Sequence, residues 1–401
     1  MNLKKVRYDH EVRIVHITRQ FLDVSFGGVE QHIYSIASEQ SKLGHEVKVI
    51  RIGSKPQGNY NSSKFHFKFV QFGRALEQVH DSQATYGIFL ELLNRLQSNM
   101  YSKSQYENLL VEIGTADAVH FHDFLGVVRV SRRLSGLYSL YWTNHLGEFL
   151  MLSRLLVGSV ITKFATRQFK FAIGPSRELA NSKKMGCPVK YIPNGCQELL
   201  PIDSTRDESL DLRKQFNLAN ESIFLVPRRW APTKGIKQLS EALKLLDLQG
   251  KAFFVFIGRG EGNYGKYRES VSKDLTECKT SYAVLERVSP EEMLRYYKMS
   301  DFTVIPSLEE ATSLAALEAM AMSSLVLATP IGGLCEIIKD SETGLLAKDT
   351  SPEAISELLL RALKMNTRER EVIQQNALNN VNNNYLWTNI AKQVMEVYEC
   401  Q

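Results

Sequence analysis

The sequence predicts an α/β protein of two domains, each built on a parallel β-sheet. Three observations support this prediction. The chain has 401 residues, too many for one ordinary hydrophobic core, and this length fits two domains of about 150–200 residues each. Short apolar runs alternate with amphipathic helical patterns, as they do in successive β/α units. This alternation occurs in two series, separated by a polar stretch at residues 197–220.

The first series begins with the strand pattern VRIVHI at residues 12–17. A loop with two adjacent glycines follows, then a helix through Lys42, which Gly44 ends before the strand pattern EVKVIRI. Residues 71–112 have a helical but ambiguous pattern. The runs AVHFH and SLYWTNH then predict two further strands, and both of them end in histidine.

The second series holds the strand patterns SIFLVP, AFFVFIG, YAVLERV, DFTVIP and LVLATP, with helical patterns between them. In the helix SPEEMLRYYKMS we expect Ser289 to be the N-cap, Pro290 the first helical residue and Glu292 the partner in a capping box. The same opening, SPE, recurs at Ser351. Two successive series of this kind predict two Rossmann-like domains that face each other across a cleft.

Composition limits the functional class. The apolar fraction of 44% and the charged fraction of 23% are those of a soluble globular protein. The formal net charge of +5 is small, and the cations are mixed with acidic residues, which favours a local basic face for phosphates or anionic lipid over nucleic-acid binding. The five cysteines form no C-x-x-C pair, so neither a zinc knuckle nor a disulfide framework is expected.

No segment has the pattern of a targeting or membrane-spanning sequence. The amino terminus is basic, but charged and polar residues follow where a signal peptide needs a continuous apolar core. The most apolar long stretch, 151–174, is interrupted by four cations and makes a poor membrane span. It predicts a helix packed on the sheet, followed by a strand in FAIGPS, with a helix on the membrane surface as the alternative. We therefore expect a cytoplasmic protein, for which peripheral membrane contact remains an alternative.

The stretch PSLEEATSLAALEAMA, residues 306–321, places Glu310 before an alanine- and leucine-rich helix and Glu318 in its second turn. A helix that begins near Thr312 or Ser313 exposes unpaired backbone N–H groups at the sheet edge where ligands bind. Either hydroxyl can cap only one of these donors, and no carboxylate lies in the first turn, so a phosphate could accept hydrogen bonds from the others. The two glutamates could accept hydrogen bonds from hydroxyls on either side, as a sugar nucleotide would supply. A packing helix with Glu318 in solvent would show the same pattern.

A second charged group lies in the loop FLVPRRWAPTKGIKQL. Arg228 and Lys234 stand six positions apart, between a strand and a helix that begins near Gly235. Two cations at that edge could neutralise a diphosphate leaving group. A solvated basic loop is the alternative interpretation of the pair taken alone.

Glycines mark two further loops. Gly27 and Gly28 precede a helix in FGGVEQHI, where glycine lets a ligand approach the backbone closely, although a structural turn fits equally well. In FIGRGEG the glycines are Gly258, Gly260 and Gly262. Neither stretch has the spacing G-x-G-x-x-G, which disfavours a dinucleotide cofactor, and we expect no cofactor.

Seven motifs occur in one order along the chain: GGVE, TNH, IPNG, an Arg-x5-Lys-Gly loop, FIGRGEG, SDFTVIPSLEEATSLAALEAMA and TPIGGLCEIIKDSETGLL. Together they resemble the family 4 retaining glycosyltransferases, over almost the whole chain and most strongly at residues 191–346. The resemblance implies a GT-B fold, in which the second domain holds mainly the donor and the first mainly the acceptor. It also implies that the final helix, in NNYLWTNIAKQVMEVYE, crosses back to the first domain. The expected divisions are then 1–197, 198–382 and, for the crossing helix, 383–401.

The same resemblance implies the catalytic residues. Glu310 matches the glutamate that contacts the donor sugar, and Arg228 and Lys234 match the pair on the diphosphate. His145 matches a first-domain histidine near the transferred sugar. These four residues are the expected catalytic set.

The resemblance also implies a donor-binding set. Gly28 matches the glycine-rich loop that closes over the reaction centre, and Glu318 matches the glutamate that holds the ribose. The expected donor-binding residues are Gly28, Gly258, Thr312, Ser313, Leu314 and Glu318. The run at 311–313 departs from the family's glycine-phenylalanine-glycine type, which bears on donor selectivity, and Gln197 stands where an aspartate is common.

The function implied is transfer of a hexosyl or N-acetylhexosaminyl unit from a UDP-sugar or similar donor to an acceptor hydroxyl on a sugar, glycolipid or small molecule. No two aspartates lie two positions apart, so a D-x-D metal motif is absent and metal-independent chemistry is expected. We assign no protein nucleophile. A sugar-nucleotide epimerase and a non-catalytic partner subunit are the alternatives. His120 and His122 could line an acceptor site or belong to the core, and neither is assigned to the site.

Overall fold

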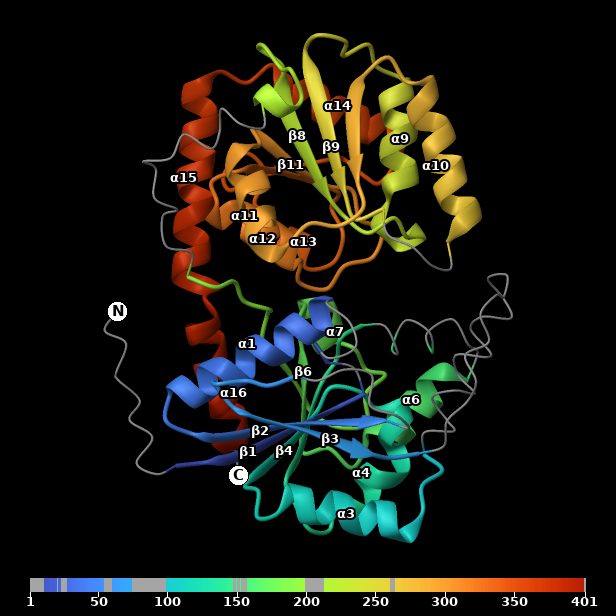
Figure 1. Ribbon diagram of the computed structural model, residues 1–401, viewed down its shortest axis with the longest axis vertical. Coiled ribbons are helices and arrows are strands. Elements are labelled where there is room, and N and C mark those ends of the chain that lie inside the picture. The colour runs from blue at the N-terminus through green and yellow to red at the C-terminus, as the bar shows by residue number, and fades with distance from the viewer. Residues whose placement is uncertain are drawn as a thin grey trace. The chain divides into compact units, whose positions relative to one another are not determined.

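A computed structural model describes residues 11–19, 21–22, 27–53, 60–73, 99–146, 149, 152, 157–198, 213–259 and 264–399. The chain divides into two compact units. The first joins Met1–Pro193 to Trp387–Gln401, and the second is Asn194–Leu386. Figure 1 shows the elements of each unit.

The first unit is a parallel sheet of seven strands in the order β3-β2-β1-β4-β5-β6-β7. Its strands are β1 Arg13–Thr18, β2 Glu46–Gly53, β3 His66–Gln71, β4 Ala118–Phe121, β5 Leu140–Thr143, β6 Phe171–Gly174 and β7 Val189–Tyr191. Its helical segments are α1 Gly28–Lys42, α3 Lys103–Ile113, η1 Leu125–Val127, α4 Val128–Leu134, α6 Gly158–Thr166, α7 Arg177–Ala180 and α16 Trp387–Glu399. All neighbouring strands pair in parallel, as the alternation of strand and helix patterns predicts.

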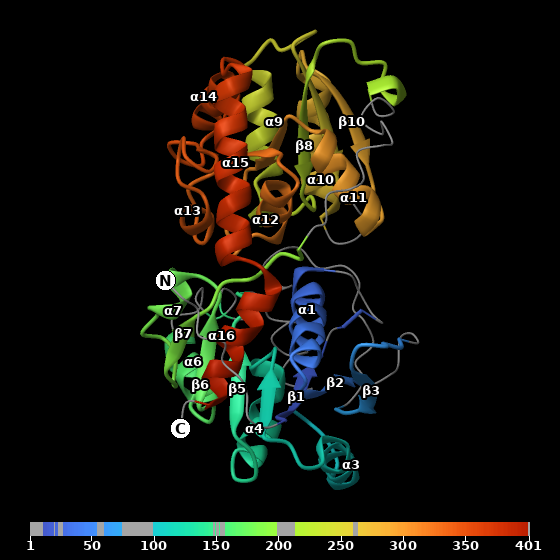
Figure 2. The same ribbon diagram turned by 90° about the vertical axis from the view of Figure 1, so that its left-hand side faces the viewer.

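One apolar cluster of the first unit joins the sheet to α1 and α16. Ile33 and Ala37 of α1 and Met395 of α16 are buried in it with Ile14 of β1 and Val47 of β2. Figure 2 shows α16 next to α1. The helix that ends the chain is therefore part of the first unit's core, although it follows the second unit in sequence.

The second unit is a parallel sheet of six strands in the order β10-β9-β8-β11-β12-β13. Its strands are β8 Ser222–Pro227, β9 Ala252–Ile257, β10 Ser281–Leu285, β11 Phe302–Ile305, β12 Leu325–Ala328 and β13 Leu345–Leu346. Its helical segments are η2 Pro232–Lys234, α9 Ile236–Lys244, α10 Gly265–Glu277, α11 Pro290–Met299, α12 Leu314–Ala321, α13 Leu334–Ile337, α14 Pro352–Leu363 and α15 Thr367–Asn384.

Both faces of this second sheet are covered by helices. Phe224 and Val226 of β8 are buried in one cluster, which contains residues of α9, α10 and α14. Ile223 and Leu225, which alternate with them, belong to a second cluster with residues of α11, α12 and α15. Because successive side chains of a strand point to opposite faces, the continuous apolar run of β8 serves both clusters. In Figure 1, α9 and α10 lie on the opposite side of the sheet from α11 and α12.

The predicted helix starts of the second unit are confirmed. The Ser289 hydroxyl accepts a hydrogen bond from the backbone N–H of Glu292 at 3.2 Å, and the Glu292 carboxylate accepts one from the Ser289 N–H at 2.8 Å. The hydroxyl of Ser351 caps the N–H of Ala354 at 3.2 Å. These caps satisfy donors that the first turn of a helix leaves open.

The ambiguous pattern at 71–112 gives a mixed result. A helix is wrong at its start, because Gln71 is the last residue of β3, whose sequence HFKFVQ alternates polar and apolar residues as a strand does. It is right at the end, where α3 begins at Lys103, and residues 74–98 lie outside the described part. The helix predicted within 151–174 is present as α6 and is followed by β6. In the parts of the chain that are described, no helix is both long and apolar enough to cross a membrane.

Candidate active site

The start of α12 in the second unit has no side-chain cap. Ser313 occupies the N-cap position with extended backbone angles, but its side chain makes no capping hydrogen bond, and the first turn contains no acidic residue. Of the two hydroxyls that could cap one donor, that of Ser313 does not, because it lies 3.5 Å from Nη1 of Arg228 and accepts a hydrogen bond from it. The first-turn N–H groups are thus left without a side-chain cap from Ser313, as a phosphate site requires.

Arg228 and Lys234 converge on one oxygen of Glu310. Oε2 of Glu310 accepts hydrogen bonds from Lys234 Nζ at 3.0 Å, from the Arg228 guanidinium and from the Ser307 hydroxyl at 3.2 Å. Nη2 of Arg228 also donates to the Ser307 hydroxyl at 2.8 Å. The structure therefore places three of the four expected catalytic residues in direct contact, and it adds Ser307, which the sequence did not identify.

The balance of charge in this group favours an anion. Arg228 is 8% exposed, and two cations share a single carboxylate, which leaves one positive charge in excess. Among the described residues, the buried Nε of Arg228 has no hydrogen-bond partner. Since a buried charge is costly unless it is paired, an anionic ligand would complete the pairing.

The pKa values of the group follow from burial and from these charges. Burial by itself would raise the pKa of the Glu310 carboxyl, but Arg228 and Lys234 outweigh it and hold that pKa below its ordinary value. Burial lowers the pKa of Lys234 to about 8, and the charge of Arg228 acts in the same direction while Glu310 opposes it. Glu310 is therefore ionised at neutral pH and Lys234 is mostly protonated.

Glycines allow the loops of this site to approach one another. A Cβ atom on Gly235 would lie 1.6 Å from the carbonyl oxygen of Pro306, and Gly235 also has a positive φ of 66°. Gly258 has a φ of 105°, and its Cβ would lie 3.3 Å from the carbonyl oxygen of Arg228. Gly235 thus lets the Lys234 loop reach the end of β11, and Gly258 supports the backbone at Arg228. Direct contact of Gly258 with a donor stays a prediction.

The remaining residues of this unit that were expected to bind the donor have other partners. The Tyr297 hydroxyl donates to Oε2 of Glu318 at 3.1 Å, and burial raises the pKa of Glu318 to about 7, with the Tyr297 hydrogen bond in opposition. Thr312 receives two hydrogen bonds from Asn194, one at its hydroxyl at 3.2 Å and one at its carbonyl at 3.1 Å. Leu314 is the first residue of α12 and is partly buried. Glu318 thus contacts Tyr297 and is not part of the Arg228 group.

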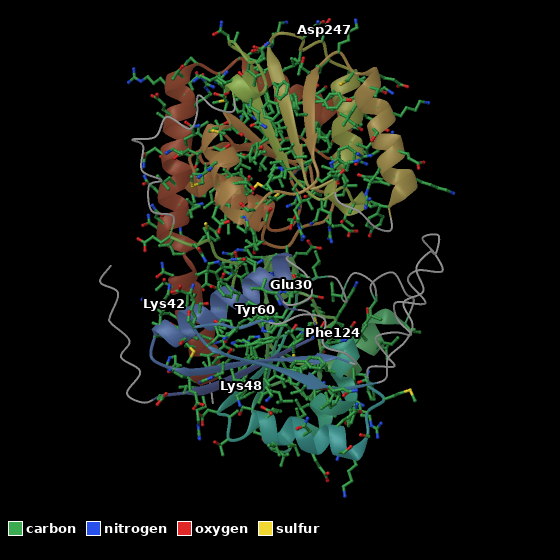
Figure 3. All side chains as sticks on the ribbon, viewed as in Figure 1. Glu30, Lys42, Lys48, Tyr60, Phe124 and Asp247 are labelled. Atoms are coloured by element: carbon green, nitrogen blue, oxygen red, sulfur yellow. The ribbon has the colours of Figure 1, made fainter. Side chains whose placement is uncertain are left out.

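The first unit contains the two other predicted residues, Gly28 and His145. Gly28 is the exposed first residue of α1, whose two ends are marked by Glu30 and Lys42 in Figure 3. An acidic side chain in the first turn and a basic one in the last both suit the helix dipole. The ring of His32, further along α1, meets the ring of His145 edge to face, with 4.8 Å between their centroids.

His145 belongs to a group of five histidines, which we call the histidine cluster. Its members come from the ends of neighbouring strands and from α1: His16, His32, His120, His122 and His145. His120 bonds the Thr143 hydroxyl at 2.7 Å and the Tyr398 hydroxyl at 2.5 Å, so the core interpretation holds for it. The sequence indicated His120, His122 and His145 as strand ends but not their association.

Burial is the main cause that lowers the pKa of four histidines of this cluster. One ring nitrogen each from His32, His122 and His145 lies within 4.8 Å of the others, close enough for a metal ion to be considered. However, Nδ1 of His122 and Nε2 of His145 are already joined by a hydrogen bond at 3.0 Å. The expectation that the protein uses no metal stays a prediction.

Comparison with known proteins finds one matching family model and several similar sequences. Residues 208–380 match the family model described as glycosyl transferases group 1. Lipopolysaccharide 1,2-N-acetylglucosaminetransferase of Salmonella typhimurium is 33% identical over 217 residues, which cover 52% of this chain and 55% of that protein. The chain thus matches about half the length of this relative. An uncharacterized glycosyltransferase of Methanocaldococcus jannaschii is 24% identical over 421 aligned positions. The match covers 97% of this chain and 98% of that protein.

Solved structures share the fold. Sucrose-phosphate synthase from Thermosynechococcus elongatus has a TM-score of 0.76 at 19% identity and covers 96% of this chain and 98% of its own. The Anabaena protein HepE in complex with UDP and glucose has a TM-score of 0.71 at 15% identity, with 98% of this chain and 100% of its own covered. The predicted fold class, two α/β units of GT-B type, is confirmed. Residues 208–380 thus match a glycosyl transferases group 1 model, and the solved structures share the fold.

Proposed function

We propose that this chain, whose residues 208–380 match the group 1 glycosyl transferases, is a family 4 enzyme that acts with retention and without a metal. It moves a hexosyl or N-acetylhexosaminyl unit from a nucleotide-diphosphate sugar, with UDP as the expected nucleotide, to an acceptor hydroxyl. The observation that carries this proposal is the shared contact of Arg228 and Lys234 with Glu310, next to the uncapped start of α12.

The donor diphosphate would enter this group as a competing anion. Its oxygens accept hydrogen bonds from Lys234, from Arg228 and from the first-turn N–H groups of α12. Arg228 and Lys234 then stabilise the charge that develops on the leaving diphosphate, which is the work that a metal does in other transferases. Because these cations turn to the diphosphate, the Glu310 carboxylate is released to accept hydrogen bonds from hydroxyls of the transferred sugar.

The other residues have supporting roles in this proposal. Glu318 accepts hydrogen bonds from the ribose, and its contact with Tyr297 holds the carboxylate in place. His145 binds near the transferred sugar from the first unit, which holds the acceptor. No protein nucleophile is assigned, because the departing phosphate can help to deprotonate the acceptor hydroxyl at the same face of the sugar.

Names of similar proteins leave the donor sugar open. Among them are an N-acetylglucosaminetransferase of Salmonella typhimurium and an O-antigen chain mannosyltransferase B of Escherichia coli. Starch synthase IV of Arabidopsis thaliana has this fold and is described with ADP and acarbose. The proposal therefore commits to a diphosphosugar of hexose or N-acetylhexosamine type, and the nucleotide needs a direct test.

A donor panel with a chelator tests the proposal. UDP-, ADP- and GDP-sugars are each added to the protein in EDTA, and the melting temperature is measured, since a ligand that binds only the folded state raises it. The donor that stabilises the protein is then incubated with and without an acceptor extract. Transfer only with acceptor supports the transferase. Donor turnover without acceptor indicates an epimerase, and a panel with no binding would indicate a non-catalytic subunit.

A further inference from the structure

A chain of hydrogen bonds runs through the histidine cluster and ends at His145. Oε1 of Gln40, in the last turns of α1, lies 2.7 Å from Nε2 of His16 on β1. Nδ1 of His16 lies 3.0 Å from Nε2 of His122, which directly follows β4. Nδ1 of His122 lies 3.0 Å from Nε2 of His145, which follows β5. This series of hydrogen bonds thus crosses three neighbouring strands, β1, β4 and β5, at their carboxyl ends.

The three histidines of this hydrogen-bonded series, His16, His122 and His145, are neutral at pH 7. Burial lowers the pKa of His16 to about 4 and that of His145 to about 3, and it holds the pKa of His122 well below its ordinary value. A neutral imidazole has one N–H and one bare nitrogen. Three such rings in series must therefore all point their N–H groups the same way along the chain.

We infer that Gln40 sets this direction and so fixes the tautomer of His145. The amide oxygen of Gln40 can only accept, so His16 carries its proton on Nε2 and has a bare Nδ1. His122 then donates from Nε2, and its own bare Nδ1 accepts from Nε2 of His145. It follows that His145 has the proton on Nε2 and a lone pair on Nδ1.

Tyr398 supplies the second partner of the Gln40 amide in this orientation. Nε2 of Gln40 donates to the Tyr398 hydroxyl at 3.4 Å, and that hydroxyl can donate in turn to Nδ1 of His120 at 2.5 Å. With the amide reversed, every N–H in the chain would reverse as well, and His145 would carry its proton on Nδ1. Gln40 and Tyr398 are fully or largely enclosed, so water does not compete for these contacts readily.

This inference rests on the proposed function only for its chemical consequence. A lone pair on Nδ1 of His145 accepts a hydrogen bond from a sugar hydroxyl and offers no proton to a carbonyl or ether oxygen. Gln40, His16 and His122 are then positioning residues, which act through His145 without touching the substrate. They favour a sugar that presents a hydroxyl at that point.

The tautomer can be read without any assay of transfer. The full chain is labelled with ¹⁵N-histidine, and two-bond ¹H–¹⁵N spectra at pH 7 show which nitrogen of each neutral ring is protonated, with His145 assigned by its loss in His145→Asn. We expect Nε2–H at His145 in the wild type. The Gln40→Met variant removes the acceptor and should give a mixture of tautomers.

The matched control is Gln168→Met. Gln168 is also a hydrogen-bonded amide of the first unit, but it does not belong to the series of hydrogen bonds from Gln40 to His145. Gln40→Met should lower kcat/KM by about tenfold or more, as loss of a positioning partner does at other sites, and Gln168→Met should not change it. Nδ1–H at His145 in the wild type, or an unchanged tautomer in folded Gln40→Met, would overturn the inference. If no sugar is transferred by any variant, the proposed function fails while the spectra still decide the tautomer.

Discussion

Nη1 of Arg228 donates to the hydroxyl of Ser313 at 3.5 Å, so the residue at the N-cap position of α12 is bound to a cation and not to its own helix. The contact joins the loop after β8 to the start of α12, two segments 85 positions apart in sequence. Both segments follow strands that are neighbours in the second sheet. A cation and the uncapped start of a helix thus meet at one point, which is the arrangement that a diphosphate needs.

The first prediction concerns the two cations. Arg228→Ala and Lys234→Ala should each lower the transfer rate by about a hundred- to a thousandfold, because each removes a group that stabilises the leaving diphosphate. The double variant should lose less than the product of the single losses, since the two groups serve one charge. Arg229→Ala, at the exposed neighbouring position, is the matched control and should keep nearly full activity. Wild-type rates in the Lys234→Ala protein would show that the loop has no catalytic role.

The second prediction separates the two glutamates. Glu310→Gln should lower kcat more than it changes donor affinity, because the released carboxylate is needed as the sugar bond breaks, whereas Glu318→Gln should mainly weaken donor binding. Steady-state kinetics and a donor titration measure both quantities. The opposite pattern, with normal affinity in Glu318→Gln and weak affinity in Glu310→Gln, would exchange the two roles.

The third prediction also concerns Glu310 but uses stability. Replacing it by glutamine leaves Arg228 and Lys234 buried without their carboxylate, so the variant should melt at a lower temperature than the wild type. A nucleoside diphosphate supplies the missing negative charge, and its stabilising effect should be larger in the variant. Thermal shifts at saturating UDP compare the two proteins. An equal shift in both would mean that the diphosphate does not replace Glu310 as the partner of these cations.

The fourth prediction is a pH dependence that arises from Glu318. Its pKa in the folded protein is about 7, above the ordinary value of 4.5, so its protonated form stabilises the fold below about pH 4.5, and this contribution is lost as the pH rises through about 7. At 1.36 kcal/mol per pH unit, the upper limit of the loss is about 3 kcal/mol. Glu318→Gln stays neutral at all pH values. Its stability relative to the wild type should therefore rise from pH 5 to pH 8 in urea titrations, and a constant difference would contradict the raised pKa.

Sequence reasoning reached the fold and the charged centre because both depend on local order. Apolar strands separated by helices predict parallel sheets, and the carboxyl ends of such strands meet at one edge, which brings Arg228, Lys234 and Glu310 together. The contact of the Ser313 hydroxyl with Arg228, in place of a capping hydrogen bond, was missed because Arg228 follows a different strand. Tyr297 was missed because its contact with Glu318 depends on how α11 packs against α12, which residue spacing does not reveal.

The histidine cluster was missed for a similar reason. His16 is one of several residues in an apolar strand pattern, and only the register of β1 with β4, in which His16 lies opposite His120, brings it to the cluster. Register is set by the packing of the whole sheet. The available signal was a histidine at the end of two strand patterns and one inside a third, and it needed the strand order β1-β4-β5 to become meaningful.

The last prediction follows from the low pKa values of that cluster. His16, with a pKa of about 4, stays neutral in the folded protein under conditions where the unfolded chain binds a proton near its ordinary pKa of 6.5. Its contribution to stability is therefore present above about pH 6.5 and is lost as the pH falls toward 4. Replacing His16 by asparagine removes the titrating ring, so the loss of stability between pH 7 and pH 4.5 should be smaller in His16→Asn than in the wild type. His66→Asn, at an exposed position of β3, is the control and should follow the wild-type curve. Urea denaturation across this range measures the three curves. Parallel curves for His16→Asn and the wild type would mean that His16 is charged in the folded state, which contradicts the neutral series of imidazoles that leads from Gln40 to His145.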